Sequence, residues 1–452
     1  MSRPDLEAAA QLAVDAALAA GSDEADAWCQ DSVERTVRVY DGAVESLTEA
    51  GARGAGVRVF REGRSGYAYG SDLSEEGLRT LAREATESAG VTEPDEHAGI
   101  PRNPGAASID GLSAAGFGEW TMERRIDLAL AVERAARERD PLVSNVEDTV
   151  YSDTEARAAL ANSNGFCDSF EETQCYAFAY AFAGDGADRM TGMGFAVGRG
   201  PDELDPEAVG REAADRALSL HGARQPESRR CAVVLDPHVS ASFASIIGRT
   251  LSADAVQRGR SLFAGREGEQ IAAPAFRLVD DGLHPEGLAT APFDGEGVAQ
   301  QVTPLIEDGV LRTYLFDTYT ANKGDRSSTG NGERGSYRTP PAVAPSNLRV
   351  APGESSAADL LKEAGDGLYV MGVAGLHSGV NPVSGSFSVG ATGRLIRDGE
   401  LAEPAREMTI ASDLVSMLQG VQSAAREARW VPFGGSVQAP ALLVREMTVG
   451  GS

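Results

Sequence analysis

The sequence has little positive charge, and this limits the partners it can bind. It holds 41 Lys and Arg residues against 68 Asp and Glu residues, which gives a formal net charge of −27. Only Lys323 and Lys362 are lysines. Proteins bind nucleic acid by neutralising its phosphates with Lys and Arg, so we expect no nucleic-acid partner for this chain.

Long apolar runs and paired cysteines are also missing. The N-terminal segment contains Asp5, Glu7 and Asp15, which interrupt any apolar run of the kind found in a signal peptide. No stretch approaches the roughly 18 apolar residues that a membrane helix needs. The four cysteines form no Cys-x-x-Cys pair, as expected of reduced thiols inside a cell. We therefore expect a cytoplasmic protein with no membrane partner.

Several enzyme motifs are absent as well. There is no GxxxxGK[ST] phosphate loop and no GxSxG nucleophile elbow. Residues 330–335, GNGERG, fit the GxGxxG dinucleotide pattern by letters. The flanking residues show neither the preceding strand nor the following helix that this function needs. We predict a flexible surface loop at this position.

Histidines are few, and their positions argue against a pair of histidine ligands for a metal. No two of the five histidines share a helix or loop, as an HExxH site would require. His284, in a loop with Asp280 and Asp281, is the best remaining candidate for a metal ligand. A loop histidine among solvated acids explains the same pattern and is the interpretation we favour. No sequence pattern supports a Cys–His nucleophile either.

The length of 452 residues predicts two or three domains. A helix that stops at Gly21, an antiparallel meander and a helix over 74–89 make a first unit. Residues 91–111 contain three prolines and no periodicity, which predicts a linker. A second unit begins near Trp120 and contains a helix over about 206–220.

A buried strand and a helix open the last part of the chain. Residues 231–236, CAVVLD, form a continuous apolar run, which is typical of a strand buried on both faces. Asp236 then caps a helix that has Pro237 at its first position. One face of this helix is predicted to be buried, namely Val239, Phe243, Ile246, Ile247 and Leu251.

The rest of the chain is mostly β in pattern. Hairpins turn at Asp-Gly pairs, and one helix is expected near 409–420. These patterns indicate an α+β fold rather than regular βαβ alternation, with a β-rich C-terminal domain. We place the domains at 1–111, 112–225 and 226–452.

The segment 372–396 is rich in glycine and small polar residues. It can form a groove for an extended peptide, because glycine lets a second backbone come close and pair. Tight β-turns that need glycine for steric reasons explain the composition equally well. The candidates for the peptide groove are His377, Ser378, Gly379, Asn381, Ser384 and Phe387.

Three blocks of the sequence resemble one known family. The first is AGARGAGVRVFREGRSGYAYG, the second is APFDGEGVAQQVTPLIEDGVLRTYLFD, and the third is GLHSGVNPVSGSFSVGATGRLIRDGEL. Together with the terminal LLVREMTVGG, these blocks resemble the TldD/PmbA family from about residue 20 to the end of the chain. The resemblance implies a two-part fold, with an N-terminal α+β portion of two units followed by a β-rich C-terminal domain.

The resemblance also implies a branch of the family. TldD subunits carry an HExxxH helix and a later Cys that hold a catalytic zinc ion. The corresponding positions in this chain are Ala244, Ser245, Arg249 and Ala424, none of which supplies that chemistry. This departure points to the TldE/PmbA branch, with no metal or other cofactor in this chain and with zinc in the partner subunit.

The implied function is that of a non-catalytic subunit. TldD with TldE forms a heterodimeric peptidase for flexible or unfolded peptides, acting in peptide-antibiotic maturation and antitoxin turnover. We therefore expect a TldD-like HExxxH partner and peptide substrates, with a homodimer also possible. An older family label, modulator of DNA gyrase, fits poorly with a charge of −27. Alternatives are a stand-alone homodimeric hydrolase, a tailoring enzyme of peptide natural products, and a scaffold without peptide contact.

Overall fold

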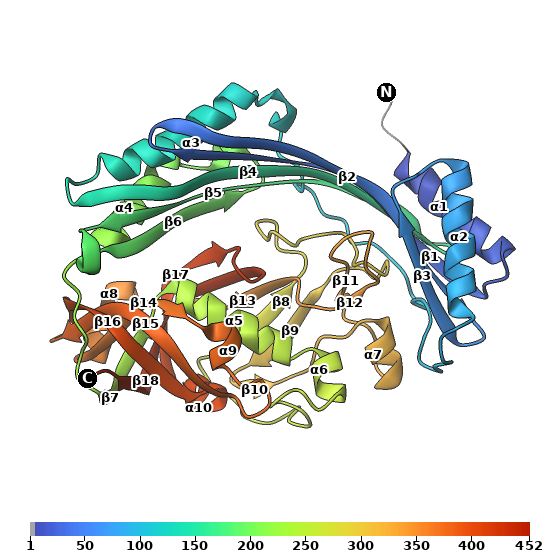
Figure 1. Ribbon diagram of the computed structural model, residues 1–452. Coiled ribbons are helices and arrows are strands. Elements are labelled where there is room, and N and C mark those ends of the chain that lie inside the picture. The colour runs from blue at the N-terminus through green and yellow to red at the C-terminus, as the bar shows by residue number, and fades with distance from the viewer. Residues whose placement is uncertain (1–4) are drawn as a thin grey trace.

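The computed structural model describes residues 5–452 and has an α+β fold. The first four residues of the predicted 1–111 domain lie outside the described part. A long curved sheet built by the N-terminal half arches over a C-terminal domain (Figure 1). Among the described residues, no helix is both long enough and apolar enough to cross a membrane.

The arch is one six-stranded sheet to which both N-terminal units contribute. Its order is β3-β2-β1-β4-β5-β6, and every neighbouring pair is antiparallel. The strands are β1 (Glu24–Tyr40), β2 (Ala43–Arg61), β3 (Arg64–Gly70), β4 (Val143–Asn162), β5 (Cys167–Ala183) and β6 (Met190–Gly198). The helices are α1 (Leu6–Ala19), α2 (Glu75–Ala89), α3 (Met122–Arg137) and α4 (Pro206–Ser219), with short 3-10 turns at Phe117–Glu119, Gly186–Asp188 and Pro201–Glu203.

The first two strands of the predicted meander are long and continuous. β2 runs through its glycines without a turn. A Cβ at Gly54 would lie 2.3 Å from the Tyr337 ring, and a Cβ at Gly56 would lie 2.1 Å from the Tyr67 hydroxyl. These glycines therefore make room for aromatic side chains and do not end the strand.

The four N-terminal helices cover the outer side of the arch in two pairs (Figure 1). α1 and α2 pack on one end through Leu6, Leu78 and small alanines, and α3 and α4 pack on the other end through Val132 and Val209. The inner side of the sheet is left facing the C-terminal domain (Figure 1). Residues 91–111 contain neither helix nor strand and run between the two ends, as a linker does.

The C-terminal domain is built around a ten-stranded mixed sheet. β18 pairs with both β16 and β7, so β18, β16, β15, β14 and β7 close into a ring. Its strands are β7 (Arg229–Leu235), β8 (Leu278–Asp281), β9 (Val302–Glu307), β10 (Val310–Leu311), β13 (Asn347–Val350), β14 (Gly367–Ala374), β15 (Ser386–Arg397), β16 (Glu400–Asp413), β17 (Val421–Val431) and β18 (Ser436–Gly450). β11 (Gly332–Glu333) and β12 (Ala342–Val343) form a separate two-stranded sheet. The helices are α5 (Pro237–Thr250), α6 (Ala253–Gln257), α7 (Thr318–Lys323), α8 (Ala357–Ala364), α9 (Leu376–Gly379) and α10 (Leu414–Gln419).

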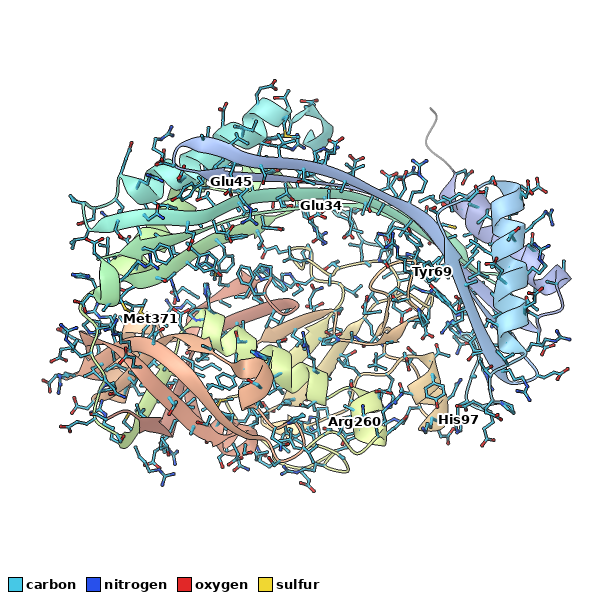
Figure 2. All side chains as sticks on the ribbon, viewed as in Figure 1. Glu34, Glu45, Tyr69, His97, Arg260 and Met371 are labelled. Carbon is cyan, nitrogen blue, oxygen red and sulfur yellow. The ribbon has the colours of Figure 1, made fainter. Side chains whose placement is uncertain are left out.

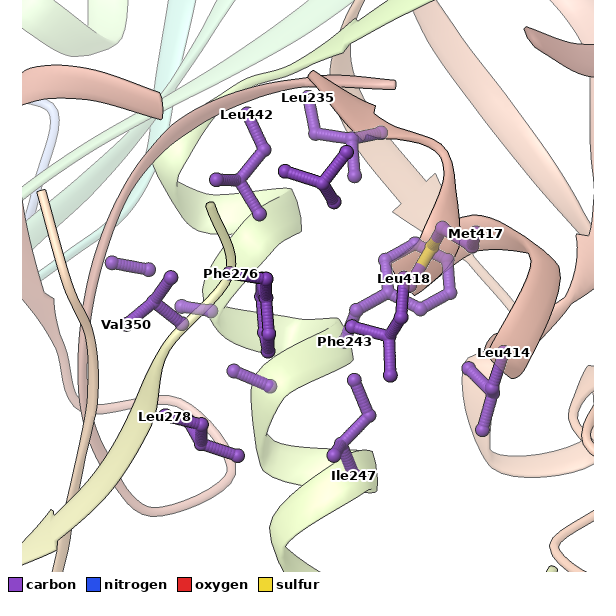
Figure 3. Close-up of a cluster of buried hydrophobic side chains, with 14 of the residues drawn as sticks. Leu235, Phe243, Ile247, Phe276, Leu278, Val350, Leu414, Met417, Leu418 and Leu442 are labelled. Atoms are coloured by element: carbon purple, nitrogen blue, oxygen red, sulfur yellow. The ribbon is translucent and has the colours of Figure 1, made fainter. Parts of the chain in front are cut away.

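α5 is the central helix of this domain. The predicted cap is confirmed: Asp236 accepts a hydrogen bond from the backbone N–H of His238 at 3.1 Å. Phe243 and Ile247 pack among Phe276, Leu418 and other apolar side chains (Figure 3). The predicted buried face is confirmed except at Ile246, which is half-buried.

The Asp-Gly hairpins are confirmed, and one helix boundary was wrong. Asp308-Gly309 and Asp398-Gly399 turn with both residues at positive φ, as a two-residue hairpin loop requires. The helix expected near 409–420 begins only at Leu414. The residues before it belong to β16, because they pair with β15 on one side and β18 on the other.

Charged side chains join the arch to the C-terminal domain at both ends, and at the α4 end Arg216 of α4 pairs with Asp236 at 3.1 Å. At the α1 end, Arg58 of β2 binds Asp26 and also Glu296, which belongs to the C-terminal domain. Arg334 binds the other oxygen of Asp26 at 2.6 Å. The flexible surface loop predicted at 330–335 is therefore wrong, since Gly330, Asn331 and Gly332 are buried and the Arg334 side chain is 1% exposed.

Candidate functional site

One face of α5 carries polar side chains toward two cavities. His238, Ser242, Ser245 and Arg249 follow each other at intervals of four, three and four residues, so they share a face of the helix. Ser242 and His238 line one cavity, and Ser245 and Arg249 line another. The hairpin loop after β17, residues 432–435, contributes to the walls of both cavities.

The cavity beside Arg249 has a volume of about 460 Å³. The hydroxyl of Ser245 donates to the carbonyl oxygen of Gly434 at 2.7 Å, and Arg249 Nη2 donates to the same oxygen at 3.1 Å. These two bonds hold the hairpin loop against the helix. The remaining wall is formed by Ser252, Val343, Ala344, Pro345, Ser346, Leu348, Gly435, Ser436 and Val437.

The four positions where the family resemblance places the zinc motif do not all meet. Ser245 and Arg249 lie together at the cavity. Ala244 is 2% exposed and belongs to the apolar core under α5. Ala424 pairs with Leu442 in the β17–β18 ladder, and its carbonyl lies beside Gly353. The segment that reaches Ser245 and Arg249 from β17 is instead the Gly434 loop.

These residues do not fit a zinc ion. Structural and catalytic zinc sites use Cys, His and carboxylate ligands, and Ala244, Ser245, Arg249 and Ala424 offer none of these. A guanidinium would also repel a divalent cation. Among residues 5–452 there is no group of three or more His, Cys, Asp or Glu side chains arranged to hold a metal.

The predicted peptide-groove residues surround a separate, shallow cavity away from these two. Ser378, Gly379, Asn381 and Phe387 line it, and its volume is about 540 Å³. His377 is exposed beside it, on α9. Ser384 is exposed in the adjoining turn.

Several of these side chains are engaged within their own turn. Asn381 Oδ1 accepts the backbone N–H groups of Val383 and Ser384, and the Ser384 hydroxyl lies 2.8 Å from that of Ser386. A Cβ at Gly379 would lie 2.7 Å from the carbonyl oxygen of Ser388. Phe387 is buried and lies 5.0 Å from the Phe243 ring. The side-chain groups that remain free at the cavity are few, so an arriving peptide would meet mostly backbone.

The cavity beside His238 and Ser242, of about 420 Å³, lies where the arch meets the C-terminal domain. Met371 lines this cavity and marks the boundary between the arch and the C-terminal domain in Figure 2. Burial lowers the pKa of His238 to about 4, so its imidazole is neutral near pH 7. The His238 ring packs 4.7 Å from Phe195, and its Nε2 is buried without a hydrogen-bond partner within residues 5–452. This histidine therefore carries no positive charge near pH 7.

His284 does not join a metal site. Its ring lies 5.3 Å from the Trp430 ring, and its Nδ1 accepts the backbone N–H of Glu286. Asp281 is paired with Arg349 at 2.8 Å. Asp280 is buried behind Ser346, where burial raises its pKa to about 6. The surroundings of His284 are those of a structural loop residue.

The cysteines do not have the character of nucleophiles. The pKa of Cys29 is raised to about 12, and the pKa values of Cys167, Cys175 and Cys231 are also raised, each chiefly by burial. A raised pKa keeps the thiol protonated, whereas a nucleophile must be a thiolate. All four are free cysteines.

Three family domains match the chain in order. Residues 25–89 match PmbA/TldA metallopeptidase domain 1, residues 116–220 match the central domain, and residues 228–451 match the C-terminal domain. The chain belongs to the PmbA/TldD family. The resemblance found in the sequence and the predicted α+β fold are thereby confirmed.

Relatives of known name span almost the whole chain. Metalloprotease PmbA of Escherichia coli O157:H7 is 28% identical over 457 residues, covering 99% of this chain and 97% of that protein. A metalloprotease of Methanothermobacter thermautotrophicus is 28% identical and covers 95% of each chain. The chain is thus a member of a family of metallopeptidase-related proteins.

Solved structures share the fold over the full length. A Thermotoga maritima protein, named as a candidate modulator of a DNA gyrase, superposes with a TM-score of 0.89 at 27% identity and covers 97% of this chain and 99% of its own. TldE from Thermococcus kodakarensis gives the same TM-score at 22% identity, with the same coverage. The likeness to TldE shows a shared fold.

The sequence alone did not reveal the cavity on α5. Its two halves, Ser245 with Arg249 and the Gly434 loop, lie 185 or more residues apart in the chain. A signal was present in the pair Gly434-Gly435, directly before a strand. Both glycines have positive φ, at 89° and 132°, which marks a loop whose backbone conformation is fixed.

Proposed function

We propose that this chain is the non-catalytic, TldE/PmbA-like subunit of a two-subunit metallopeptidase that processes or degrades flexible peptides. The observation that supports it is the cavity on α5. Two of the four positions where the family resemblance places the zinc motif lie there, and they hold Ser245 and Arg249 in place of ligands. Water activation at zinc would be supplied by an HExxxH partner subunit.

An unpaired strand edge supports assembly with such a partner. Over residues 43–53, β2 pairs with β1 only, because β3 covers just residues 55–61 of its other edge. All of residues 43–53 are exposed, among them Val44 and Leu47. Glu45 marks this part of the strand in Figure 2. A long unpaired edge with apolar side chains favours association unless a partner covers it. We infer that the partner subunit lies along this edge.

The substrate class follows from the inner side of the molecule. The cavity at Arg249 and the 377–387 groove leave backbone and polar groups for contact, and we infer that they receive an extended peptide. Main-chain hydrogen bonds give affinity without a strict side-chain code, which suits flexible peptides of varied sequence. The four free cysteines agree with a reducing, cytoplasmic setting.

A stand-alone hydrolase is the weaker alternative. The thiols, whose raised pKa values keep them protonated, and the neutral His238 leave no activated nucleophile–base pair among these groups of the described chain.

The test is co-expression with HExxxH family members from the same organism. We expect one of them to co-purify with this chain and the pair to cleave an unstructured test peptide, while this chain alone is inactive. Replacing the first His of the partner's motif by Ala should abolish cleavage by the pair. The proposal is wrong if this chain cleaves the peptide alone, or if the pair keeps its activity with the partner's motif removed.

A further inference from the structure

Arg249 presents a cation to a cavity that has no counter-ion. It is exposed on the last turn of α5 and lines the cavity of about 460 Å³. None of the residues that line this cavity is acidic. Within residues 5–452, Arg249 forms no ion pair, and its only hydrogen bond from the guanidinium goes to the Gly434 carbonyl through Nη2. The other guanidinium N–H groups remain available to a ligand.

Other donors line the same cavity. The Ser252 hydroxyl accepts the backbone N–H of Ala255, which leaves its own hydrogen without an acceptor among the described residues. The backbone N–H groups of Gly434 and Gly435 likewise have no acceptor within residues 5–452. A Cβ at Gly435 would meet nothing within 4 Å, so open space lies beside this backbone.

A buried acid behind the cavity lining does not neutralise these donors. Asp280 lies behind Ser346 and accepts the Ser346 N–H, the Ser346 hydroxyl and Asn331 Nδ2. Its oxygens are thus already hydrogen-bonded away from the cavity. The cavity therefore combines one fixed positive charge with several unused donors and no acid in its lining.

We propose that this cavity binds a carboxylate group of the peptide that the subunit handles. The inference rests on the proposed function and adds a chemical feature of its substrate. A guanidinium binds a carboxylate through two parallel hydrogen bonds. The unused hydroxyl and glycine N–H groups can donate the remaining hydrogen bonds to the carboxylate oxygens. Either a C-terminal carboxylate or an Asp or Glu side chain supplies this group. Because the chain has a net charge of −27 and repels anions, a local cation is needed to bind an anionic group.

The test uses three small probes and the intact chain without a partner. N-acetyl-Ala-Ala has only a terminal carboxylate, N-acetyl-Asp-Ala-amide has only a side-chain carboxylate, and N-acetyl-Ala-Ala-amide has none. Saturation-transfer difference NMR titrations give the Kd of each. We expect at least one carboxylate probe to bind about tenfold or more tightly than the neutral amide. The probe that does so identifies the source of the carboxylate.

Variants locate the site. Arg249→Gln should weaken binding of the carboxylate probe about tenfold or more. Arg249→Lys should restore part of the affinity, because lysine keeps the positive charge but lacks the two parallel N–H donors of the planar guanidinium. Arg260→Gln is the matched control. Arg260 is also exposed and forms no ion pair among residues 5–452, but it lies on the loop after α6, outside the cavity lining (Figure 2). It should bind like the parent chain. Circular dichroism would confirm that each variant is folded.

Three outcomes would overturn the inference. They are equal binding of the neutral amide, unchanged binding by Arg249→Gln, and no binding of any probe. None of these bears on peptide cleavage by the assembled pair, which is measured separately. A pair that cleaves peptides while the chain fails these titrations would leave the proposed function standing and remove the carboxylate site alone.

Discussion

Arg58 of the arch and Glu296 of the C-terminal domain form a buried ion pair, with Nη1 2.9 Å from Oε1. Their side chains are 11% and 1% exposed, and they lie 238 residues apart in the chain. Glu296 Oε2 also accepts the backbone N–H of Thr318, at the start of α7. One carboxylate therefore ties together a strand of the arch and a helix of the C-terminal domain.

Breaking this pair should destabilise the whole molecule. Arg58→Gln would leave Asp26 and Glu296 buried without their shared cation, and we expect a loss of about 3–5 kcal/mol in the free energy of unfolding. Denaturant unfolding measures this loss. The matched control is Arg79→Gln, which removes an exposed pair with Glu75 and should cost about 0.5 kcal/mol or less. Equal losses in the two variants would contradict the structural role given to Arg58.

The acids of the same region should make stability depend on pH. Burial and the nearby Asp294 carboxylate raise the pKa of Glu333 from 4.5 to about 8. The unfolded chain releases this proton near pH 4.5, so the folded state binds more protons between 4.5 and about 8. The stability from Glu333 is therefore fully present below pH 4.5 and is lost as the pH rises through about 8.

The measurement is the melting temperature across that range of pH. We predict that Glu333→Gln, which cannot ionise, makes the fall in Tm with rising pH less steep. Glu76→Gln, at an exposed position of α2, should leave the slope unchanged. A slope that is the same in Glu333→Gln and the parent would refute the assignment.

The exposed edge of β2 gives a prediction about assembly. Leu47 is 45% exposed on the unpaired edge, and Leu47→Lys would place an unpaired charge in any interface formed there. We expect the variant to fold normally and to bind its HExxxH partner about tenfold or more weakly. Sedimentation velocity gives the affinity. Val91→Lys, at a position 87% exposed and outside the sheet, is the control and should assemble like the parent. Unchanged assembly of Leu47→Lys would exclude this edge as the interface.

The groove at 377–387 is tested by filling it. Ser378 lines the cavity of about 540 Å³ and is exposed, so Ser378→Trp can occupy the space without disturbing the core. We predict normal assembly and about tenfold slower peptide cleavage by the pair, because the substrate backbone is kept out. Val383→Trp is the control, since Val383 is 56% exposed in the same turn but lies outside the lining. If both variants cleave at the parent rate, the groove has another role.

Local signals in the sequence were sufficient for much of the fold. The cap at Asp236, the buried face of α5 and the hairpins at Asp308-Gly309 and Asp398-Gly399 each depend on a few neighbouring residues. The blocks that resemble the family were likewise contiguous in the chain. Such features can be read from composition and spacing, because the interactions that stabilise them are close in sequence.

The features that escaped prediction depend on distant contacts. Residues 330–335 read as a flexible loop, yet Arg334 is held by Asp26, 308 residues earlier. The cavity at Arg249 exists only because the Gly434 loop folds back on α5. Asn381, a candidate for peptide contact, has its amide oxygen engaged by the turn itself. No local pattern records which distant segment will supply the second half of such a site.

The central claim is that the partner subunit holds the catalytic zinc and this chain holds none. The most direct test of this claim is the zinc content of the separate chains. Elemental analysis of this purified chain, its HExxxH partner and the assembled pair should be combined with peptide cleavage before and after chelation. We predict less than about one-tenth zinc per molecule and no cleavage for this chain, because Ala244, Ser245, Arg249 and Ala424 offer no zinc ligand. The pair should hold about one zinc and lose its activity with the chelator. One tightly bound zinc in this chain alone, with cleavage that a chelator abolishes, would contradict the account.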